Sequence, residues 1–227
     1  MFSLYEGKIN NKIPSKTIDF NTLINIIKTN PYNRDYNIIR IHKKGELEYN
    51  QGKKELVRCH PNCVLRFNSI SGPNFEKNYE IGSGYIYLDI DNLNNPIELK
   101  KEFISKYKDV VSMVCLSSGG SGLSVLVKIN HLITSKYEYK CIIDFLKSQY
   151  FGDVEFDSGS DKLSQMWFIS YDPYVFVNSE VCIDVSEGLK CVDQGIIQRV
   201  VSNNTLFYAL EKEIMYLSIS DINSNLI

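Results

Sequence analysis

Tyr-Ile-Tyr-Leu-Asp-Ile-Asp, residues 85–91, is the stretch that decides the predicted fold of this chain. Side chains alternate between the two faces of a β-strand, so the three aliphatic residues lie on one face and the two tyrosines and two aspartates on the other. Asp89 and Asp91 are then roughly 6–7 Å apart along the strand. Like charges this close repel unless a cation neutralises them, and carboxylates bind hard divalent cations. We therefore predict a metal site on this strand.

The composition is that of a globular protein. The 227 residues are 44% apolar and 12% aromatic, which is enough to build a core. No apolar run is long enough to span a bilayer, and the N-terminal residues lack a signal-peptide pattern. The six cysteines are scattered, as in proteins of reducing compartments. We expect a cytoplasmic protein with no membrane segment.

The charge is distributed unevenly along the chain. Residues 1–80 hold 13 Lys and Arg against 8 Asp and Glu, whereas residues 81–227 hold 12 against 19. This pattern predicts a phosphate-binding surface facing a metal site, although a solvated basic surface explains it equally well. The basic residues concerned are Lys43, Lys44, Lys53, Lys54, Arg58 and Arg66.

The N-terminal region is expected to be an αβ unit. Asp19 is suited to cap a helix that ends at Asn30-Pro31. The expected elements are an irregular arm (1–18), a helix (19–28), a strand (36–42), a short helix or hairpin (45–58), a strand (63–67) and a loop (69–84).

From Gly84 onward the pattern predicts the order β-α-β-β-α-β. The expected elements are a strand (85–91), a helix (96–107), two strands (110–116 and 123–129), a helix (135–150) and a strand (165–170). This order is typical of a ferredoxin-like or RNA-recognition-motif-like core, whose first and third strands are neighbours and whose helices cover one face. The face that carries the aspartates would then be open.

The predicted fold class is α+β, with the N-terminal unit packed on the ferredoxin-like core. The expected divisions are a basic αβ region (1–83), a catalytic core (84–178) and a C-terminal extension (179–227) with a terminal helix at 204–217. Together they would form one compact module.

A glycine-rich turn at residues 117–122 is expected beside the aspartates. Its free N–H groups and hydroxyls suit a triphosphate, and a hairpin between two strands also uses such residues. Asp157 could add a third carboxylate, with Asp153, Glu155 and Asp161 as nearby alternatives. Carboxylates beside a phosphate-binding turn are what two-metal nucleotidyl transfer requires.

Three motifs in this order resemble the archaeo-eukaryotic primase superfamily, and most closely the primase-polymerase domains of mobile elements, including the VirE N-terminal-like group. The motifs are Tyr-Leu-Asp-Ile-Asp (87–91), Ser-Ser-Gly-Gly-Ser-Gly-Leu-Ser-Val (117–125) and Phe-Asp (156–157) followed by residues 164–173. The resemblance covers roughly residues 35–178. It implies templated synthesis by a DNA primase-polymerase from ribo- or deoxynucleoside triphosphates with two Mg²⁺ or Mn²⁺ ions.

The resemblance also implies roles for particular residues. Asp89, Asp91 and Asp157 would be the catalytic metal ligands. From the charge pattern, a single-stranded DNA template would contact Lys53, Lys54, Arg58 and Arg66, and a primer and a helicase could be further partners. The nucleotide would be bound by Ser118, Gly120, Ser121, Gly122, Ser124, Lys128 and Gln165.

Two positions depart from the family pattern. Ser124 stands where the second motif usually ends in a histidine that holds the nucleotide phosphates, and Gln165 stands where an arginine is common. A serine brings no charge to this contact, so Lys128 or the basic N-terminal region would have to compensate.

Three other readings stay open. A non-catalytic nucleic-acid-binding module could use Tyr85, Tyr87 and Trp167 for stacking, although carboxylates on that face would repel phosphates. A template-independent nucleotidyltransferase or cyclase could use the same paired aspartates. Cys59-His60-Pro61-Asn62-Cys63 suggests zinc, but no second pair of ligands follows it.

Overall fold

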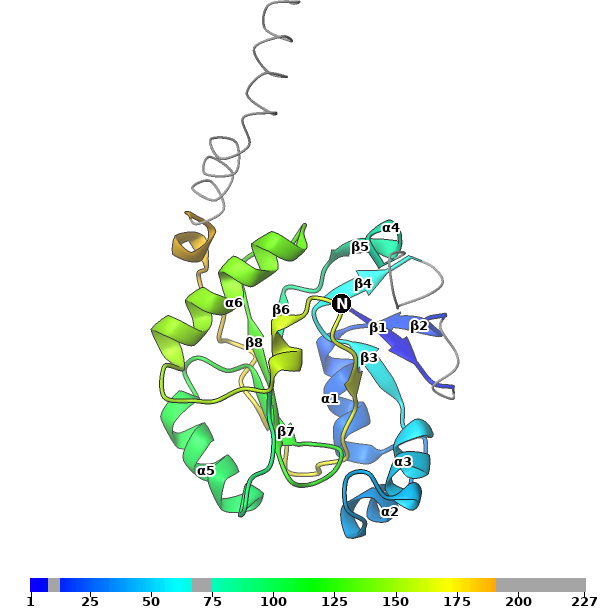
Figure 1. The fold of residues 1–227 in the computed structure, drawn as a ribbon. Helices are drawn as coiled ribbons and strands as arrows, with labels where there is room; N and C mark the ends of the chain where they lie inside the picture. The colour runs from blue at the N-terminus through cyan, green and yellow to red at the C-terminus, as the bar shows by residue number, and fades with distance from the viewer. Residues whose placement is uncertain (8–12, 67–74, 191–227) are drawn as a thin grey trace, which may run out of the picture.

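The computed structural model describes residues 1–7, 13–66 and 75–190 as a mixed α and β structure with antiparallel sheets (Figure 1). The strands are β1 (Phe2–Tyr5), β2 (Lys16–Ile18), β3 (Arg58–His60), β4 (Cys63–Leu65), β5 (Tyr79–Gly82), β6 (Tyr85–Ile90), β7 (Met113–Leu116), β8 (Leu123–Lys128), β9 (Trp167–Phe168) and β10 (Phe176–Val177). The helices are α1 (Phe20–Thr29), α2 (Tyr36–Ile41), α3 (Leu47–Lys54), α4 (Phe75–Asn78), α5 (Pro96–Tyr107), α6 (Lys136–Tyr150) and the 3-10 helix η2 (Ser158–Asp161).

The central sheet has the strand order β10-β7-β8-β6, and each strand is antiparallel to its neighbours. As predicted, β6 lies beside β8, with Asp89 opposite Ser124. The helices α5 and α6 also form where the sequence predicts them. Pro96 starts α5, and the Ser135 hydroxyl caps α6 by accepting a hydrogen bond from the Glu138 backbone N–H.

The aliphatic face of β6 is buried beneath these helices, as predicted. Ile86, Leu88 and Ile90 share one hydrophobic core with Phe103 of α5 and Ile142 of α6. Figure 1 shows both helices on the same side of the central sheet.

The opposite face of β6 is not open, and this part of the prediction is wrong. Tyr87 is 2% exposed and shares a second hydrophobic core with Phe2 of β1, Leu23 of α1 and Trp167 of β9. The N-terminal region therefore covers the tyrosines, and the carboxylates are accessible where β6 ends.

The N-terminal residues belong to a second sheet, of order β2-β1-β3-β9, so the predicted irregular arm is wrong as well. All four residues of β1 are buried, and β1 pairs with both β2 and β3. Because β1 has only four residues, its Phe-Ser-Leu-Tyr sequence is too short for a strand pattern to identify it.

The last predicted strand of the ferredoxin-like order lies elsewhere. The structure places β9 against β3 in the second sheet, where Phe168 is opposite Arg58, instead of beside β6. The edge of β6 that has no strand partner forms hydrogen bonds with Asn62, Asp157 and Ser160 instead.

Two further predictions in the N-terminal region are wrong. Residues 36–41 form helix α2, not a strand, because Asp35 accepts a hydrogen bond from the Asn37 N–H and caps the first turn. Tyr36 and Ile39, three residues apart, are its buried side chains. The predicted loop at 69–84 contains α4 and the strand β5, which pairs with β4.

The predicted divisions of the chain share their cores. The strand β3 of the first division pairs with β9 of the second, and Ile183 of the third bridges to Ile129 at the end of β8. The predicted helix at 204–217 lies outside the described residues. Among the helices in the described part of the chain, none is long and apolar enough to cross a membrane.

Candidate functional site

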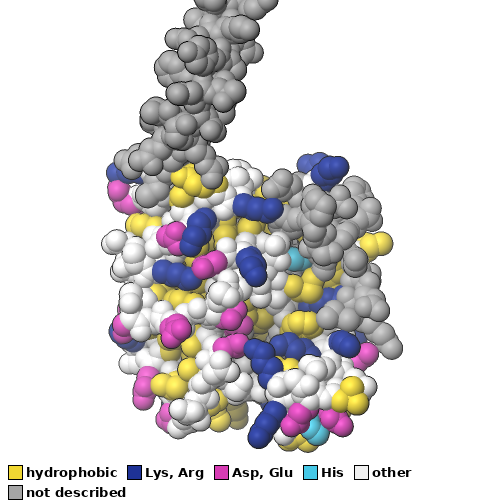
Figure 2. All heavy atoms as spheres, viewed as in Figure 1, with side chains coloured by type: hydrophobic (Ala, Val, Ile, Leu, Met, Phe, Trp, Pro, Cys, Tyr) yellow, Lys and Arg dark blue, Asp and Glu magenta, His cyan; other side chains and the backbone are white. Residues whose placement is uncertain are grey.

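A cavity of about 190 Å³ lies where β6 ends, between the central sheet and helix α3. One wall carries Asp89 and Asp91, a second carries the serines of the turn between β7 and β8, and a third carries the lysines Lys44 and Lys53. Figure 2 shows Lys and Arg side chains next to acidic ones near the middle of this face of the molecule. Two of the predicted aspartates, the glycine-rich turn and two of the predicted basic residues therefore meet at one place.

Asp89 is a partly buried residue in the wall of this cavity. Its side chain is 3.5 Å from the Ser124 hydroxyl, which is itself 3.1 Å from the Tyr87 hydroxyl. Burial, and then the negative charge of Asp91, raise the pKa of Asp89 to about 6. Asp89 is therefore held in surroundings that disfavour its ionised form.

Asp91 and Asp157 complete a group of acidic side chains with Asp89. Asp91 follows β6 and forms an ion pair with Lys44, whose Nζ is 3.3 Å from its carboxylate. The Asp157 backbone N–H donates a hydrogen bond of 2.8 Å to the Asp89 carbonyl, so the two residues are neighbours. The negative charge of Asp91 raises the pKa of Lys44, and the charge of Asp157 adds to the raised pKa of both Lys44 and Asp89.

These carboxylates lie near one another without forming a closed metal cage. Among the described residues, no group of three or more His, Cys, Asp or Glu side chains is placed to hold a metal ion. The side chain of Asp157 also accepts a hydrogen bond of 2.7 Å from the Gly159 N–H, which caps η2. The donors suit a hard divalent cation, and the Lys44 ammonium now supplies the positive charge beside Asp91.

The turn between β7 and β8 contributes serines, while its glycines have packing roles. Ser118 and Ser121 line the cavity, as predicted for a phosphate-binding turn. A side chain at Gly122 would place its Cβ 2.3 Å from the Ile90 carbonyl oxygen, so a glycine is needed for the turn to lie against β6. Gly120 has φ +76, and a Cβ added to it would lie 3.2 Å from the Arg40 side chain; it is not among the residues that line the cavity.

Of the other predicted nucleotide-binding residues, two line the cavity and one lies far from it. Ser124 and Gln165 line the cavity, although Ser124 is only 1% exposed. Lys128 is opposite Tyr85, at the far end of β8 from Ser124 and roughly 13 Å along the strand. Lys128 therefore cannot supply a positive charge beside Ser124, and that prediction is wrong.

The predicted template-binding residues are dispersed. Lys53 lines the cavity, with its ammonium 5.2 Å from the centre of the Phe168 ring, and Lys54 and Arg66 are exposed outside it. Arg58 is fully buried, donates a hydrogen bond of 3.0 Å to the Gly7 carbonyl and lies over the Tyr5 ring. Arg58 is thus part of the core, and its predicted contact with template is wrong.

The aromatic residues considered for base stacking are enclosed. Trp167 is 3% exposed and packs against Tyr87, and Tyr85 is stacked on Phe20 with ring centres 5.1 Å apart. A platform like that of RNA-recognition motifs needs accessible rings on the sheet face. The structure contradicts that use of these side chains.

Two residues that support Asp89 are absent from the sequence-based predictions. The buried Asn62 accepts a hydrogen bond of 2.8 Å from the Tyr87 N–H, and the Ser160 hydroxyl accepts one of 2.9 Å from the Asp89 N–H. The Tyr139 hydroxyl of α6 links these two residues. It accepts a hydrogen bond from the Asn62 side-chain amide and donates one to the Ser160 carbonyl. In the sequence Asn62 stands between Cys59 and Cys63, and its burial depends on the tertiary fold.

Comparison with protein-family models, with curated proteins and with solved structures gives no match for this chain.

Proposed function

We propose that this chain is a primase-polymerase catalytic domain that transfers nucleotides from nucleoside triphosphates to a nucleic-acid 3′-hydroxyl under the direction of a template. The observation that carries the proposal is that Asp89 and Asp91 line one cavity with two lysines and a serine-rich turn, while Asp157 is hydrogen-bonded to Asp89 just outside that cavity. The motifs at 87–91, 117–125 and 156–157 also follow one another in the order of the primase motifs that they resemble. In this proposal β6, α5, β7, β8 and α6 correspond to the ferredoxin-like core of the family.

The acidic side chains suit divalent cations. Burial disfavours the charge of Asp89, and a cation held by Asp89, Asp91 and Asp157 would relieve this cost. When bound, Mg²⁺ or Mn²⁺ would activate the 3′-hydroxyl and stabilise the leaving pyrophosphate. Lys44 must then give up its ion pair with Asp91, and its ammonium becomes free to contact a phosphate.

Lys53 and the serines Ser118 and Ser121 are proposed to hold the triphosphate. Lys53 reaches the cavity from α3, and its positive charge acts on Asp89 across it. This position supplies the charge that Ser124 lacks, because a lysine donates charge-assisted hydrogen bonds to phosphate. The exposed Lys54 would contact the template backbone beyond the cavity.

Primer extension on a single-stranded template tests the proposal. We expect incorporation with Mg²⁺ or Mn²⁺ and none in excess chelator, and we expect Asp89→Asn with Asp91→Asn to reduce the rate by roughly 10²-fold or more, because the electrostatic stabilisation of the transition state is lost. The matched control is Asp109→Asn with Asp144→Asn, which removes two exposed charges elsewhere. Synthesis in chelator, or equal rates for the two double variants, would refute metal-dependent transfer at this site.

A non-catalytic nucleic-acid-binding module is the second candidate. It is favoured by the absence, within the described ranges, of three side chains placed to hold a metal ion, and by Ser124 in the position of the family histidine. The two candidates differ in their response to Mn²⁺, because a ligand raises the melting temperature only of a protein that binds it. A shift that disappears in the Asp89→Asn, Asp91→Asn variant supports the enzyme, and template binding without any shift supports the module.

A further inference from the structure

A second and larger cavity, of about 810 Å³, lies on the other side of the β6 terminus, between α5 and residues 153–158. It meets the first cavity at Asp91 and Asn92. Its volume falls within the range of ligand sites, roughly 300–1,000 Å³. The proposed nucleotidyl transfer uses its edge at Asp91 and Asp157 and leaves the rest of the cavity without a role.

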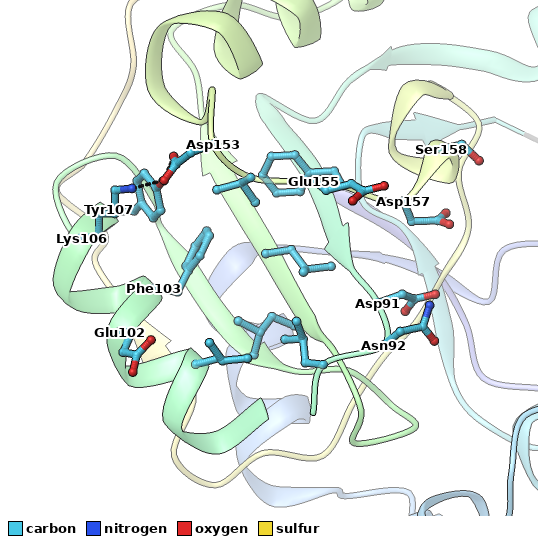
Figure 3. Close-up of a pocket in the computed structure, with 16 residues that line it drawn as sticks. Asp91, Asn92, Glu102, Phe103, Lys106, Tyr107, Asp153, Glu155, Asp157 and Ser158 are labelled. Atoms are coloured by element: carbon cyan, nitrogen blue, oxygen red, sulfur yellow. Dashed lines mark hydrogen bonds and ion pairs between the residues drawn. The ribbon is translucent and has the colours of Figure 1, made fainter. Parts of the chain in front are cut away.

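The middle of this cavity is apolar. Phe103 and Leu123 are buried in its floor, and Leu93, Leu99 and Phe156 are partly exposed around them. Figure 3 shows Phe103 between the labelled polar residues, on the α5 side. Such a surface favours an apolar side chain of a ligand, because contact removes both from water.

Both ends of the cavity are acidic. Figure 3 shows Glu155, Asp157 and Asp91 at one end, and Glu102 and Asp153 toward the other. Lys106 is the one basic side chain among the lining residues, and it already forms an ion pair with Asp153. Within the described part of the chain, Glu102 and Glu155 have no cationic partner among the ion pairs present.

From this pattern we infer that the cavity docks a peptide segment of a partner protein in which basic residues flank an apolar anchor. Asp91 and Asp153 already have lysine partners. Glu102 at one end and Glu155 at the other are therefore the side chains that attract lysine or arginine, and the floor accepts the apolar residue between them. A nucleic acid fits less well, because its phosphates would meet Glu102, Asp153 and Glu155. The inference does not depend on the proposed enzyme activity.

The test uses the full chain and fluorescein-labelled Lys-Lys-Leu-Phe-Lys-Lys, with Glu-Glu-Leu-Phe-Glu-Glu and Lys-Lys-Ser-Ser-Lys-Lys as matched probes. Fluorescence anisotropy should show binding of the first probe, and weaker or no binding of the other two. Glu102→Lys with Glu155→Lys should weaken binding by roughly tenfold or more, because each change turns an attraction into a repulsion. The control Glu98→Lys with Asp144→Lys has the same charge change outside the cavity and should bind like the wild type.

Two further measurements make the test specific. Leu99→Ser should weaken binding of the Leu-Phe probe and leave binding of the Ser-Ser probe unchanged. Circular dichroism should confirm that the variant is folded. Hydrogen exchange should slow in residues 99–107 and 153–158 when the first probe binds. Equal binding by the two charge-reversal variants, or slowing of these segments by an oligothymidylate instead of the peptide, would overturn the inference.

Discussion

At the scale of single residues, the environment of Asp89 is the strongest indication of function. A carboxylate in a half-buried position, next to Asp91 and in range of Asp157, destabilises the metal-free fold, and such a cost is common where a site is built for a ligand. Strand alternation alone predicted that Asp89 and Asp91 lie on the same face of a strand. It could not predict that Lys44, 47 positions earlier, pairs with Asp91, because a contact over that separation depends on the tertiary fold.

The raised pKa of Asp89 predicts how stability depends on pH. Since the pKa rises from 3.8 in the unfolded chain to about 6, the folded state binds more protons between these values, and the free energy of unfolding falls as pH increases through this interval. In chelator, Asp89→Asn should therefore stabilise the protein by about 1–3 kcal/mol at pH 8 and leave it nearly unchanged below pH ~4. Urea unfolding at both pH values measures this, with the exposed Asp109→Asn as control. Equal effects at the two pH values would contradict the raised pKa.

Ser124 gives a second prediction at this scale. The structure leaves no room for a histidine at position 124, because Ser124 is 1% exposed and its hydroxyl is 3.1 Å from that of Tyr87. Ser124→His should lower the free energy of unfolding by about 1–3 kcal/mol through overpacking. Ser121→His, in the exposed part of the same turn, should have little effect. If Ser124→His is as stable as the wild type and binds nucleotide more tightly, the pocket is larger than the structure indicates.

At the scale of elements, periodicity and capping residues decided which predictions are confirmed. The helices α1, α5 and α6 have clear starts, at Asp19, Pro96 and Ser135, and the structure places all three as predicted. The misassigned elements are short: β1, α2 and β5 have four to six residues, over which helical and strand patterns are hard to tell apart. Of the three, α2 has a capping residue, Asp35, whereas β1 and β5 depend on the strands with which they pair.

The hydrogen bond that Asn62 forms with the edge of β6 can be tested by mutation. Asn62→Ala removes the acceptor of the buried Tyr87 N–H, and an unsatisfied buried donor costs about 1–3 kcal/mol. We expect that loss in the free energy of unfolding, together with faster amide exchange at Tyr87 and Asp89. Asn94→Ala, in an exposed turn before α5, is the control. Unchanged exchange at both amides would show that Asn62 does not hold the edge.

At the scale of the whole molecule, the two sheets share a core, and this could not be predicted from local sequence. The face of β6 that carries Tyr87 packs against β1, α1 and Trp167, which come from both ends of the described chain. The N-terminal region thus closes the sheet face and also brings Lys44 and Lys53 to the cavity. The same packing that buries the tyrosines assembles the candidate site.

This shared core predicts that the expected catalytic division cannot fold alone. A fragment of residues 84–190 would expose Tyr87, Met113 and Leu126 and would leave β9 without its partner β3. We expect it to show no cooperative thermal transition by circular dichroism, whereas the full chain unfolds cooperatively. Adding a fragment of residues 1–83 should restore native-like amide dispersion in NMR spectra, because it supplies the missing sheet. A fragment 84–190 that melts cooperatively without that addition would mean that the divisions are independent domains and that the basic region reaches the carboxylates by docking, not through a common core.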